Sequence, residues 1–254
     1  MELLYQQWKA MGAAGEHLNL WQSFFVKFYQ AFIEADRWKQ YLEGVGSTLY
    51  VTAMALVIGV ILGVIVAVIR TAHDQQRLGH RNPVLGAVNW FCKLYTTVIR
   101  GTPMMVQLLV MGLVIFSNSR NFAMVGALTL GINSGAYVAE IIRAGIMSVD
   151  KGQSEAGRSL GLNFVQTMWY IVIPQALKNT LPALANEFIV LLKETSVACY
   201  VAVNDLTKGG EIIRSTTYQQ FLPLMAVALI YLMLVMFFSW LVGKLERRLR
   251  SSDH

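Results

Sequence analysis

Long runs of apolar residues without charge dominate this chain. The runs 46–69, 101–119, 121–139 and 215–243 each approach or exceed the roughly 20 residues that a helix needs to cross a bilayer. A further run, 180–203, is interrupted by Glu187, Lys193 and Glu194. The pattern predicts an all-α integral membrane protein with five transmembrane helices.

Composition points to the same class. The chain is 55% hydrophobic and only 14% charged, with a mean hydropathy of +0.48, far from the balance of soluble domains. We assign the net charge of +6 mainly to cytoplasmic faces beside anionic membrane lipid. No nucleic-acid binding is expected, because no basic stripe alternates with exposed aromatic residues. Cys92 and Cys199 lack metal-ligand spacing, so no metal site is expected.

The lysines and arginines predict an orientation, because such residues concentrate on the cytoplasmic side. With the amino terminus outside and the carboxyl terminus in the cytoplasm, most of them fall in inside segments. These inside cations are Arg70, Arg77, Arg81, Lys93, Arg100, Arg143, Lys151, Arg158, Lys178, Lys244, Arg247, Arg248 and Arg250. The same orientation places the polar segment 150–175 in the cytoplasm.

Residues 1–45 are predicted to form an extracytoplasmic segment with one interfacial helix. Aromatic residues recur there at helical spacing, with polar residues between them. They are Trp21, Phe24, Phe25, Phe28 and Phe32. Such a helix suits the outer leaflet of the membrane, and packing against the first span is an equal alternative.

Residues 150–175 are too polar to span a membrane, yet they carry regular helix start and stop signals. These signals are Asp150 with Gln153, Gly161, Asn163 with Gln166, and Pro174. We therefore predict a short helix, a turn and a second short helix.

This loop resembles the EAA loop of bacterial ABC-importer permeases. The family pattern is Glu-Ala-Ala, three residues, Gly, nine residues, then Ile-x-Leu-Pro. At the same spacing this chain has Glu155, Ala156, Gly157, Gly161, Ile171 and Pro174, with Gly157 in place of the second Ala and Ile173 in place of Leu. The resemblance implies that these residues dock into a groove on a cytoplasmic ATPase and couple it to the membrane helices.

Further segments resemble the polar-amino-acid branch of that family. They are Ile99 to Pro103 with Gln107, the segment 133–145, Leu192 to Ser196, and Leu245 to Leu249. Pro103 also predicts a join between an interfacial segment and a span. The resemblance implies a type I ABC-importer transmembrane domain over 46–244 and a cytoplasmic tail over 245–254, in a bacterial inner membrane.

The resemblance also implies partners. These are two ABC ATPase subunits, an extracytoplasmic solute-binding protein, and a second permease copy or a homologous permease. ATP and Mg would bind to the partner ATPase, because this chain has no Walker A sequence and no cofactor is expected in it. No catalytic constellation is found in the sequence, so the chain is not predicted to be an enzyme.

Polar residues within apolar runs are candidates for the substrate path, because such residues usually face a cavity or a partner helix. They are Gln107, Asn133, Tyr137, Glu140, Arg143, Glu187, Lys193 and Glu194. The carboxylates of Glu187 or Glu194 would meet the ammonium of an amino acid, and Arg143 or backbone donors would meet its carboxylate. For each residue, a role in helix packing is an open alternative, and Glu140 and Arg143 are spaced to pair locally.

Together these observations predict a permease subunit of an ATP-driven amino-acid importer that works by alternating access. The alternative from another class is a membrane scaffold that transports nothing. Such a scaffold would need no polar residues in the middle of the membrane.

Overall fold

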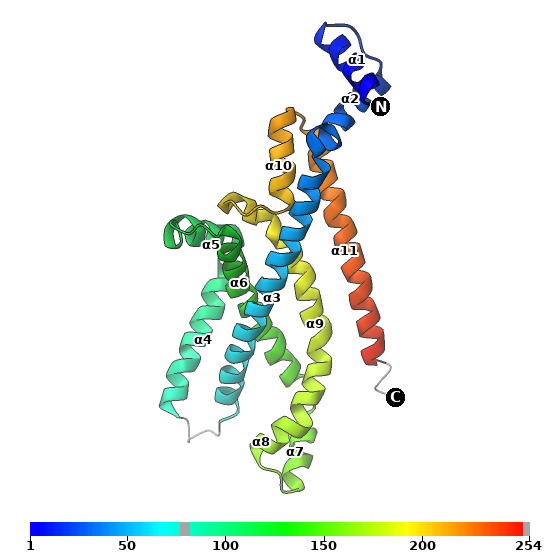
Figure 1. Cartoon of the computed structure of the whole chain (residues 1–254). Coiled ribbons are helices and arrows are strands. Elements are labelled where there is room, and N and C mark those ends of the chain that lie inside the picture. Colours follow the sequence, from blue (N-terminus) through cyan, green and yellow to red (C-terminus); the bar gives the residue numbers. More distant parts are fainter. Residues whose placement is uncertain (77–81, 251–254) are drawn as a thin grey trace.

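The computed structural model of the chain describes residues 1–76 and 82–250, with side chains up to residue 248. The described part is helical and contains no strand. Long helices alternate in direction between the two ends of the molecule (Figure 1). They are α3 (Trp38–Asp74), α4 (Pro83–Gly101), α6 (Phe122–Met147), α9 (Ile173–Glu194) and α11 (Phe221–Arg250).

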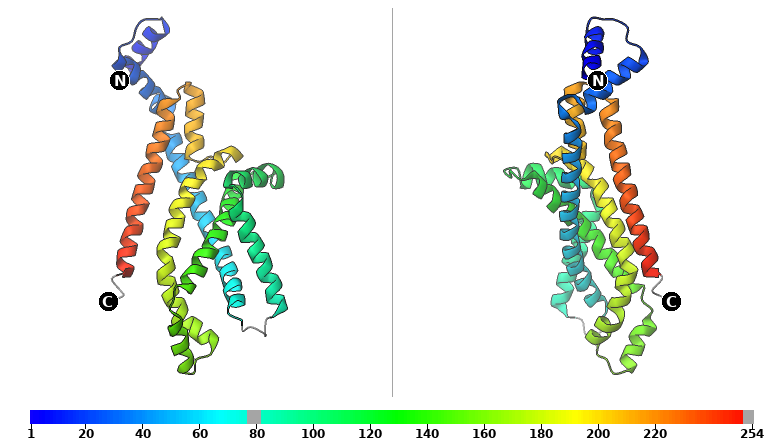
Figure 2. Two further views of the ribbon diagram at one scale, coloured as in Figure 1. Left: turned by 180° about the vertical axis from the view of Figure 1, so that it is seen from behind. Right: turned by 45° about the vertical axis from the view of Figure 1, so that its right-hand side comes forward.

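Short helices mark the two ends. One end carries α1 (Glu2–Ala13), α2 (Leu20–Phe32) and α10 (Leu206–Thr217), and the opposite end carries α7 (Lys151–Ser159) and α8 (Phe164–Thr167) (Figures 1 and 2). The carboxyl end of α11 points toward the end that carries α7 and α8. The amino-terminal segment and the polar loop therefore lie at opposite ends, as predicted from the sequence.

Three helical stretches in the described part are long and apolar enough to cross a membrane, namely Glu34–Asp74, Phe122–Met147 and Phe221–Arg248. A bent pair formed by α4 and the segment Met104–Ile115 is a fourth if it counts as one span. The all-helical membrane class is thereby confirmed. The number of five spans stays a prediction, because α9 carries several charges.

The span predicted over 101–119 is wrong as a single helix. The α4 helix ends at Gly101, Thr102 is extended, and a new axis begins with α5 (Met104–Leu109) and continues through the π-helical η2 (Val110–Ile115). The two parts are bent by 106°. Pro103 causes the break, because proline has no N–H and disfavours a helical conformation in the preceding residue. The join expected at Pro103 is found, but the long helix precedes it.

Two assignments of charged residues change with these boundaries. Lys93 and Arg100 lie within α4, although the sequence placed them in a cytoplasmic connection. Lys193 and Glu194 occupy the last positions of α9 and do not interrupt the middle of a span. The helix ends there because the chain tightens into the 3₁₀ segment η4 (Thr195–Val201). Arg77 and Arg81 lie outside the described residues.

The α3 and α6 helices cross with their backbones in close approach. Each carries two glycines four residues apart, Gly59 with Gly63 and Gly131 with Gly135. A Cβ added at Gly63 would lie 2.4 Å from Val138 Cγ1, and one added at Gly131 would lie 2.7 Å from Ile58 Cβ. Small residues at this spacing let membrane helices pack closely. The crossing is therefore fixed by the absence of side chains.

A buried apolar cluster surrounds this crossing on the side toward α1, α2 and α10. It joins α3, α5, α6, α9 and η4 through Val51, Ala55, Leu108, Ala127, Leu130, Leu191, Ala198, Val201 and Val203. These side chains are at most 3% exposed. The cluster anchors the short α5 arm to the long helices.

The amino-terminal segment forms two helices where one was predicted. Aromatic contacts join them: Tyr5 stacks on Tyr29 at 4.2 Å between centroids, and Trp8 meets Phe25 edge to face at 5.3 Å. At the far end of α2, Phe32 stacks on Tyr41 of α3. Trp21, on the opposite end of α2, is 78% exposed. Contact with the outer leaflet stays a prediction, and contact with α3 is made through Phe32.

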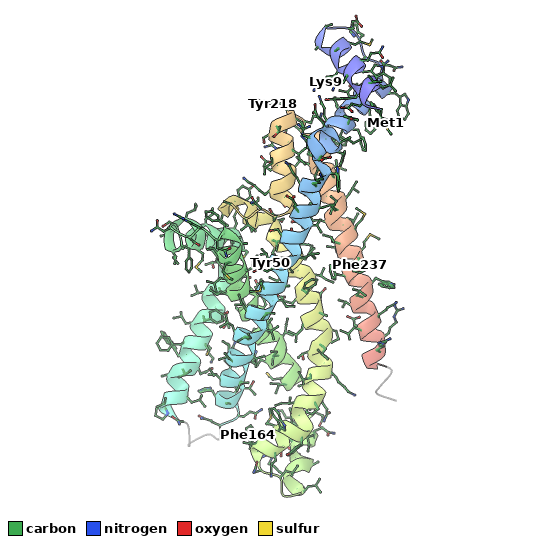
Figure 3. All side chains as sticks on the ribbon, in the orientation of Figure 1. Met1, Lys9, Tyr50, Phe164, Tyr218 and Phe237 are labelled. Atoms are coloured by element: carbon green, nitrogen blue, oxygen red, sulfur yellow. The ribbon has the colours of Figure 1, made fainter. Side chains whose placement is uncertain are left out.

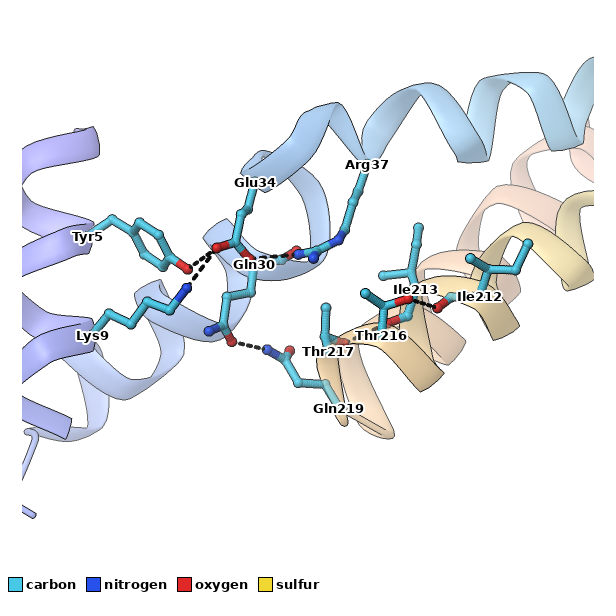
Figure 4. A network of polar contacts seen from close by, with 10 residues as sticks. All are labelled: Tyr5, Lys9, Gln30, Glu34, Arg37, Ile212, Ile213, Thr216, Thr217 and Gln219. Carbon is cyan, nitrogen blue, oxygen red and sulfur yellow. Dashed lines mark hydrogen bonds and ion pairs between the residues drawn. The ribbon is translucent and has the colours of Figure 1, made fainter. Parts of the chain in front are cut away.

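Glu34, in the short 3₁₀ turn η1 (Glu34–Asp36), ties α1 to the start of α3 (Figure 4). Its Oε1 accepts hydrogen bonds from Tyr5 Oη and Lys9 Nζ, both at 2.8 Å, and its Oε2 accepts one from Arg37 Nη1 at 2.8 Å. Burial would raise the pKa of Glu34, but the hydrogen bonds from Lys9, Tyr5 and Arg37 outweigh it and lower the pKa to about 2.

We expect replacement of Gly63 by Ala to destabilise the protein by about 1–3 kcal/mol, because the new methyl group would overlap Val138 on α6. Gly46→Ala on the same helix is the matched control, because nothing lies within 4 Å of the added carbon. That control should be neutral or gain roughly 0.5–1 kcal/mol from the better helix former. Thermal unfolding of the two purified variants distinguishes them, and equal melting temperatures would contradict the close crossing.

The Glu34 contact should depend on pH with a defined sign. Because the pKa is lowered from 4.5 to about 2, the contact is fully stabilising above pH 4.5 and is lost as the pH falls through about 2. Hydrogen-exchange protection of residues 2–13 should therefore fall between pH 4.5 and 2. Glu34→Gln should lower this protection above pH 4.5 and should differ little from wild type near pH 2. Glu16→Gln, at an exposed position between α1 and α2, should leave it unchanged.

Candidate functional site

The polar loop 150–175 folds as the sequence predicts. Asp150 caps α7 by accepting a hydrogen bond from the backbone N–H of Gly152 at 2.6 Å. At the other end, Gly161 adopts a left-handed conformation with φ of 82°. The Leu162 N–H donates to the Gly157 carbonyl at 3.1 Å, and the Gly161 N–H donates to the Arg158 carbonyl at 3.0 Å. These two bonds form a Schellman motif, which ends α7 in a fixed turn.

The second helix of the loop continues into the membrane helices. Asn163 and Gln166 form a reciprocal capping box at the start of α8. The α8 helix passes through the π-helical η3 (Met168–Val172) into α9, with Pro174 in the first turn of α9 where its missing N–H costs little. The loop is thus joined to α9 by continuous helical backbone.

Gly157 shows why the loop needs small residues. It is buried, and a Cβ there would lie 2.9 Å from both Ile171 Cδ1 and Thr167 Cγ2. The α7 helix therefore packs directly on α8 and η3. Glu155 and Ala156 remain exposed on α7.

The loop also presents a large apolar surface. Its large side chains are at least half exposed at Leu160, Phe164, Val165, Trp169 and Tyr170. A soluble loop rarely exposes so many large apolar groups together unless a partner covers them. Such exposure is typical of a surface that a partner covers.

A cavity of about 720 Å³ lies between this loop and the ends of α3 and α6. Its charged lining is mixed, with Asp74 and Glu155 facing Arg143, Lys151 and Arg158. The loop therefore does not pack tightly against the ends of α3 and α6. That space leaves room for the loop to move relative to them.

Gln107 joins the break between α4 and α5 to α6. Its Nε2 donates to the carbonyl of Ile99 at 2.7 Å and to Thr102 Oγ1 at 2.8 Å, so it satisfies backbone and side-chain acceptors at the break. Its Oε1 accepts from Asn133 Nδ2 on α6 at 2.9 Å. The structure thus brings two predicted path residues together.

Glu187 of α9 is 8% exposed and faces α6, where Ser134 Oγ donates to its Oε1 at 2.8 Å. Ser134 in turn lies at the glycine crossing, against Gly59. Lys193 and Arg143 are the two cations among the candidate path residues. Within the described residues Glu187 forms an ion pair with neither of them, and its hydrogen-bond partner is a neutral hydroxyl.

Glu140 lies among arginines from three helices. Arg70 of α3 and Arg143 of α6 bond its two carboxylate oxygens, the latter at 3.1 Å. The Nη1 of Arg100, at the end of α4, lies 3.9 Å from Oε1, and the same guanidinium lies 5.2 Å from the ring centroid of Tyr137. The predicted pairing of Glu140 with Arg143 is confirmed as one part of a larger cluster.

Lys193 and Glu194 lie apart from these groups. They line a shallow cavity of about 420 Å³ together with Met104 and Met105 of the α5 arm and with Val197. The predicted path residues therefore fall into separate contacts and do not form one site within this chain.

Three residues that contact the candidate path residues were not among the candidates predicted from the sequence. They are Arg70, Arg100 and Ser134. Arg70 and Arg100 were assigned to a connecting segment because cations usually mark membrane edges. Ser134 gave no signal, since a single hydroxyl in an apolar run usually bonds within its own helix.

Comparison with known proteins places this architecture. Residues 83–251 match the family described as binding-protein-dependent transport system inner membrane component, which is more than half of the chain. The chain belongs to this family. The resemblance drawn from Glu155 to Pro174 is confirmed at this level.

The relatives carry names that describe amino-acid permeases. The putative glutamine transport system permease protein GlnP of Rickettsia bellii is 35% identical over 82% of this chain and 92% of its own length. The arginine transport system permease protein ArtQ of Bacillus subtilis is 36% identical over 84% of this chain and 93% of its own length. The similarity covers nearly the full length of each relative.

Two solved structures have a similar fold. The crystal structure of an amino acid ABC transporter with histidines aligns with a TM-score of 0.74 and 42% identity, over 83% of this chain and 94% of that chain. An inward-facing MetNI methionine ABC transporter aligns with a TM-score of 0.71 and 17% identity, over 83% of this chain and 96% of that chain. The second likeness shows the fold alone.

We expect Glu187→Gln to lower solute uptake about tenfold or more, since a charge-assisted hydrogen bond to a substrate cation is worth more than a neutral one. Ser134 can still donate to the amide oxygen, so the melting temperature should not change. Ser134→Ala is the complementary control, because it keeps the charge but removes the partner of a buried carboxylate. It should lower stability by about 1–3 kcal/mol with a smaller effect on uptake. Joint loss of stability and uptake in Glu187→Gln would assign Glu187 to packing.

Proposed function

We propose that this chain is the permease subunit of an ATP-driven amino-acid importer. The observation that carries the proposal is the loop 150–175, in which capped helices and a buried glycine form a compact unit continuous with α9. The names of the relatives GlnP and ArtQ support an amino acid as the substrate.

The proposal includes partners for each end of the molecule. Two ABC ATPase subunits, which bind ATP and Mg, would cover the exposed apolar surface of α7, α8 and η3. A solute-binding protein would approach the end that carries α10. A second copy of this chain or a homologous permease completes the membrane part. In the inner membrane the amino terminus lies outside and the carboxyl terminus lies in the cytoplasm.

Alternating access follows from the way the loop joins the bundle. When the ATPases close on ATP, they displace the α7–α8 unit, with Glu155 and Ala156 on its exposed face. The η3 segment carries the displacement into α9, which packs on α6 and α11. Glu187 moves with α9 and would meet the ammonium of the amino acid. Opening and closing of the path is thereby coupled to ATP.

A scaffold without transport explains this structure less well. Burying the Glu187 carboxylate against a single hydroxyl costs free energy that a scaffold has no need to spend. The buried pair Gln107 and Asn133 adds a second polar contact within the helices. Both are expected in a protein that must replace water around a polar solute.

Replacement at Gly161 tests the coupling. Gly161→Val should abolish ligand-stimulated ATP hydrolysis by the reconstituted complex, because a β-branched residue is strained at a φ of 82° and the turn that ends α7 would change. Gly161→Asn should keep most of the stimulation, since Asn tolerates the left-handed conformation and nothing lies within 4 Å.

Glu155→Lys is a second variant, at an exposed position of the same loop. It should weaken copurification of the ATPase without lowering the melting temperature of the permease. Undiminished stimulation in the Gly161→Val complex would contradict the assignment of this loop to coupling.

A further inference from the structure

The cluster around Glu140 has more positive than negative charge. One carboxylate faces three guanidinium groups, those of Arg70, Arg100 and Arg143. These arginines come from α3, α4 and α6, so the cluster forms only when the three helices meet. A group of cations within apolar helices needs a compensating anion or a water-filled space. Glu140 supplies part of that compensation.

Of the three arginines, Arg100 lies furthest from the Glu140 carboxylate. Arg70 and Arg143 are within hydrogen-bond distance of Glu140, whereas the nearest Arg100 nitrogen is 3.9 Å away. No hydrogen bond of the Arg100 guanidinium occurs among the described residues, and its side chain is 43% exposed. Stacking on Tyr137 holds the guanidinium plane in place while its N–H donors stay available. The buried Nε of Arg70 also has no partner.

Arg100 enters the cluster from the opposite direction to the other two arginines. At 1.5 Å per residue it lies roughly 25 Å along α4 from Pro83, next to the α4–α5 break. Arg70 and Arg143 instead lie near the carboxyl ends of α3 and α6, which finish at Asp74 and Met147. A solute that crosses the membrane along α4 therefore passes the guanidinium of Arg100.

The cluster also continues the polar contacts of α6. Asn133, Tyr137 and Glu140 recur at helical spacing and share one face of that helix. Asn133 contacts Gln107 at the α4–α5 break, and Tyr137 contacts Arg100 directly before the same break. A solute that leaves Glu187 toward the α7–α8 end would next meet the guanidinium of Arg100.

We propose that Arg100 binds the α-carboxylate of the transported amino acid, with Arg70 and Arg143 adding positive charge and Glu140 holding those two arginines in position. An arginine fork matches a carboxylate with two parallel hydrogen bonds. At successive positions along the path, Glu187 would then meet the ammonium and Arg100 the carboxylate, the two charged groups that all α-amino acids share. This inference rests on the proposed function and adds the group that recognises the carboxylate.

The test uses the complete complex of permease and ATPase in nanodiscs, without binding protein. L-arginine and L-glutamine are compared with their α-carboxamides, which keep the ammonium and the side chain but lack the carboxylate. Wild-type complex should bind the acid forms at least tenfold more tightly than the amides, whereas Arg100→Gln should lose that preference. Arg100→Lys should keep part of it, because the charge remains without the fork. Lys93→Gln, at an exposed position on the same helix, should behave as wild type.

The outcomes separate this inference from the proposed function. Retention of the wild-type preference by Arg100→Gln would overturn the inference, while uptake by wild-type proteoliposomes would still uphold the importer. Wild-type proteoliposomes that take up no amino acid would contradict the importer itself. A preference that is absent in phosphatidylglycerol and appears only when this lipid is replaced by phosphatidylcholine would assign the anion at Arg100 to the lipid phosphate, and it would likewise overturn the inference. Melting temperatures of the variants, measured in parallel, show that each complex is folded.

Discussion

The close crossing of α3 and α6 is the constraint on which the rest of the structure depends. Glycines at both helices remove the side chains that would hold the backbones apart, and Val138 and Ile58 fill the space beside them. Because of this approach, Ser134 faces Glu187 of α9 and Glu140 reaches Arg70 of α3. Without it, the polar groups of three helices would each face lipid separately, at a cost that few membrane proteins tolerate. The same crossing supports the apolar cluster that anchors the α5 arm.

The proposed motion of the helix bundle depends on two places where one helix meets the next. At one, Pro103 breaks the helix between α4 and α5, and Gln107 donates a hydrogen bond to the carbonyl of Ile99 at this break. At the other, the α7–α8 unit joins α9 without a break. The first of these places positions Arg100 beside Tyr137, and the second connects an exposed apolar surface to the helix that bears Glu187. The proposed solute contacts and the proposed docking surface are thus linked through α9.

The sequence predicts some of these features well because their causes are local. Helix signals such as Asp150, Gly161 and Asn163 depend on a few neighbouring residues, and each occurs where expected. The apolar run 101–119 was misassigned because hydropathy does not report a bend, although Pro103 marked it. The Arg100 and Ser134 contacts could not be predicted, since they depend on how α4 and α9 meet α6. In the sequence, an arginine at the edge of an apolar run gives the same pattern whether its side chain faces the cytoplasm or a buried carboxylate.

The central claim is that the α7–α8 unit moves as one body with α9 when the partner ATPases bind ATP. Electron–electron distance measurements on the reconstituted complex test it most directly, after Cys92 and Cys199 are replaced. One pair of spin labels at Gln153 of α7 and at the exposed Leu177 of α9 reports the distance from the loop to α9, and single labels at Gln153 report the distance between two permease copies. We predict that ATP shortens the distance between copies while the distance from the loop to α9 stays the same. An unchanged distance between copies, or a distance from the loop to α9 that changes on ATP binding, would contradict the account.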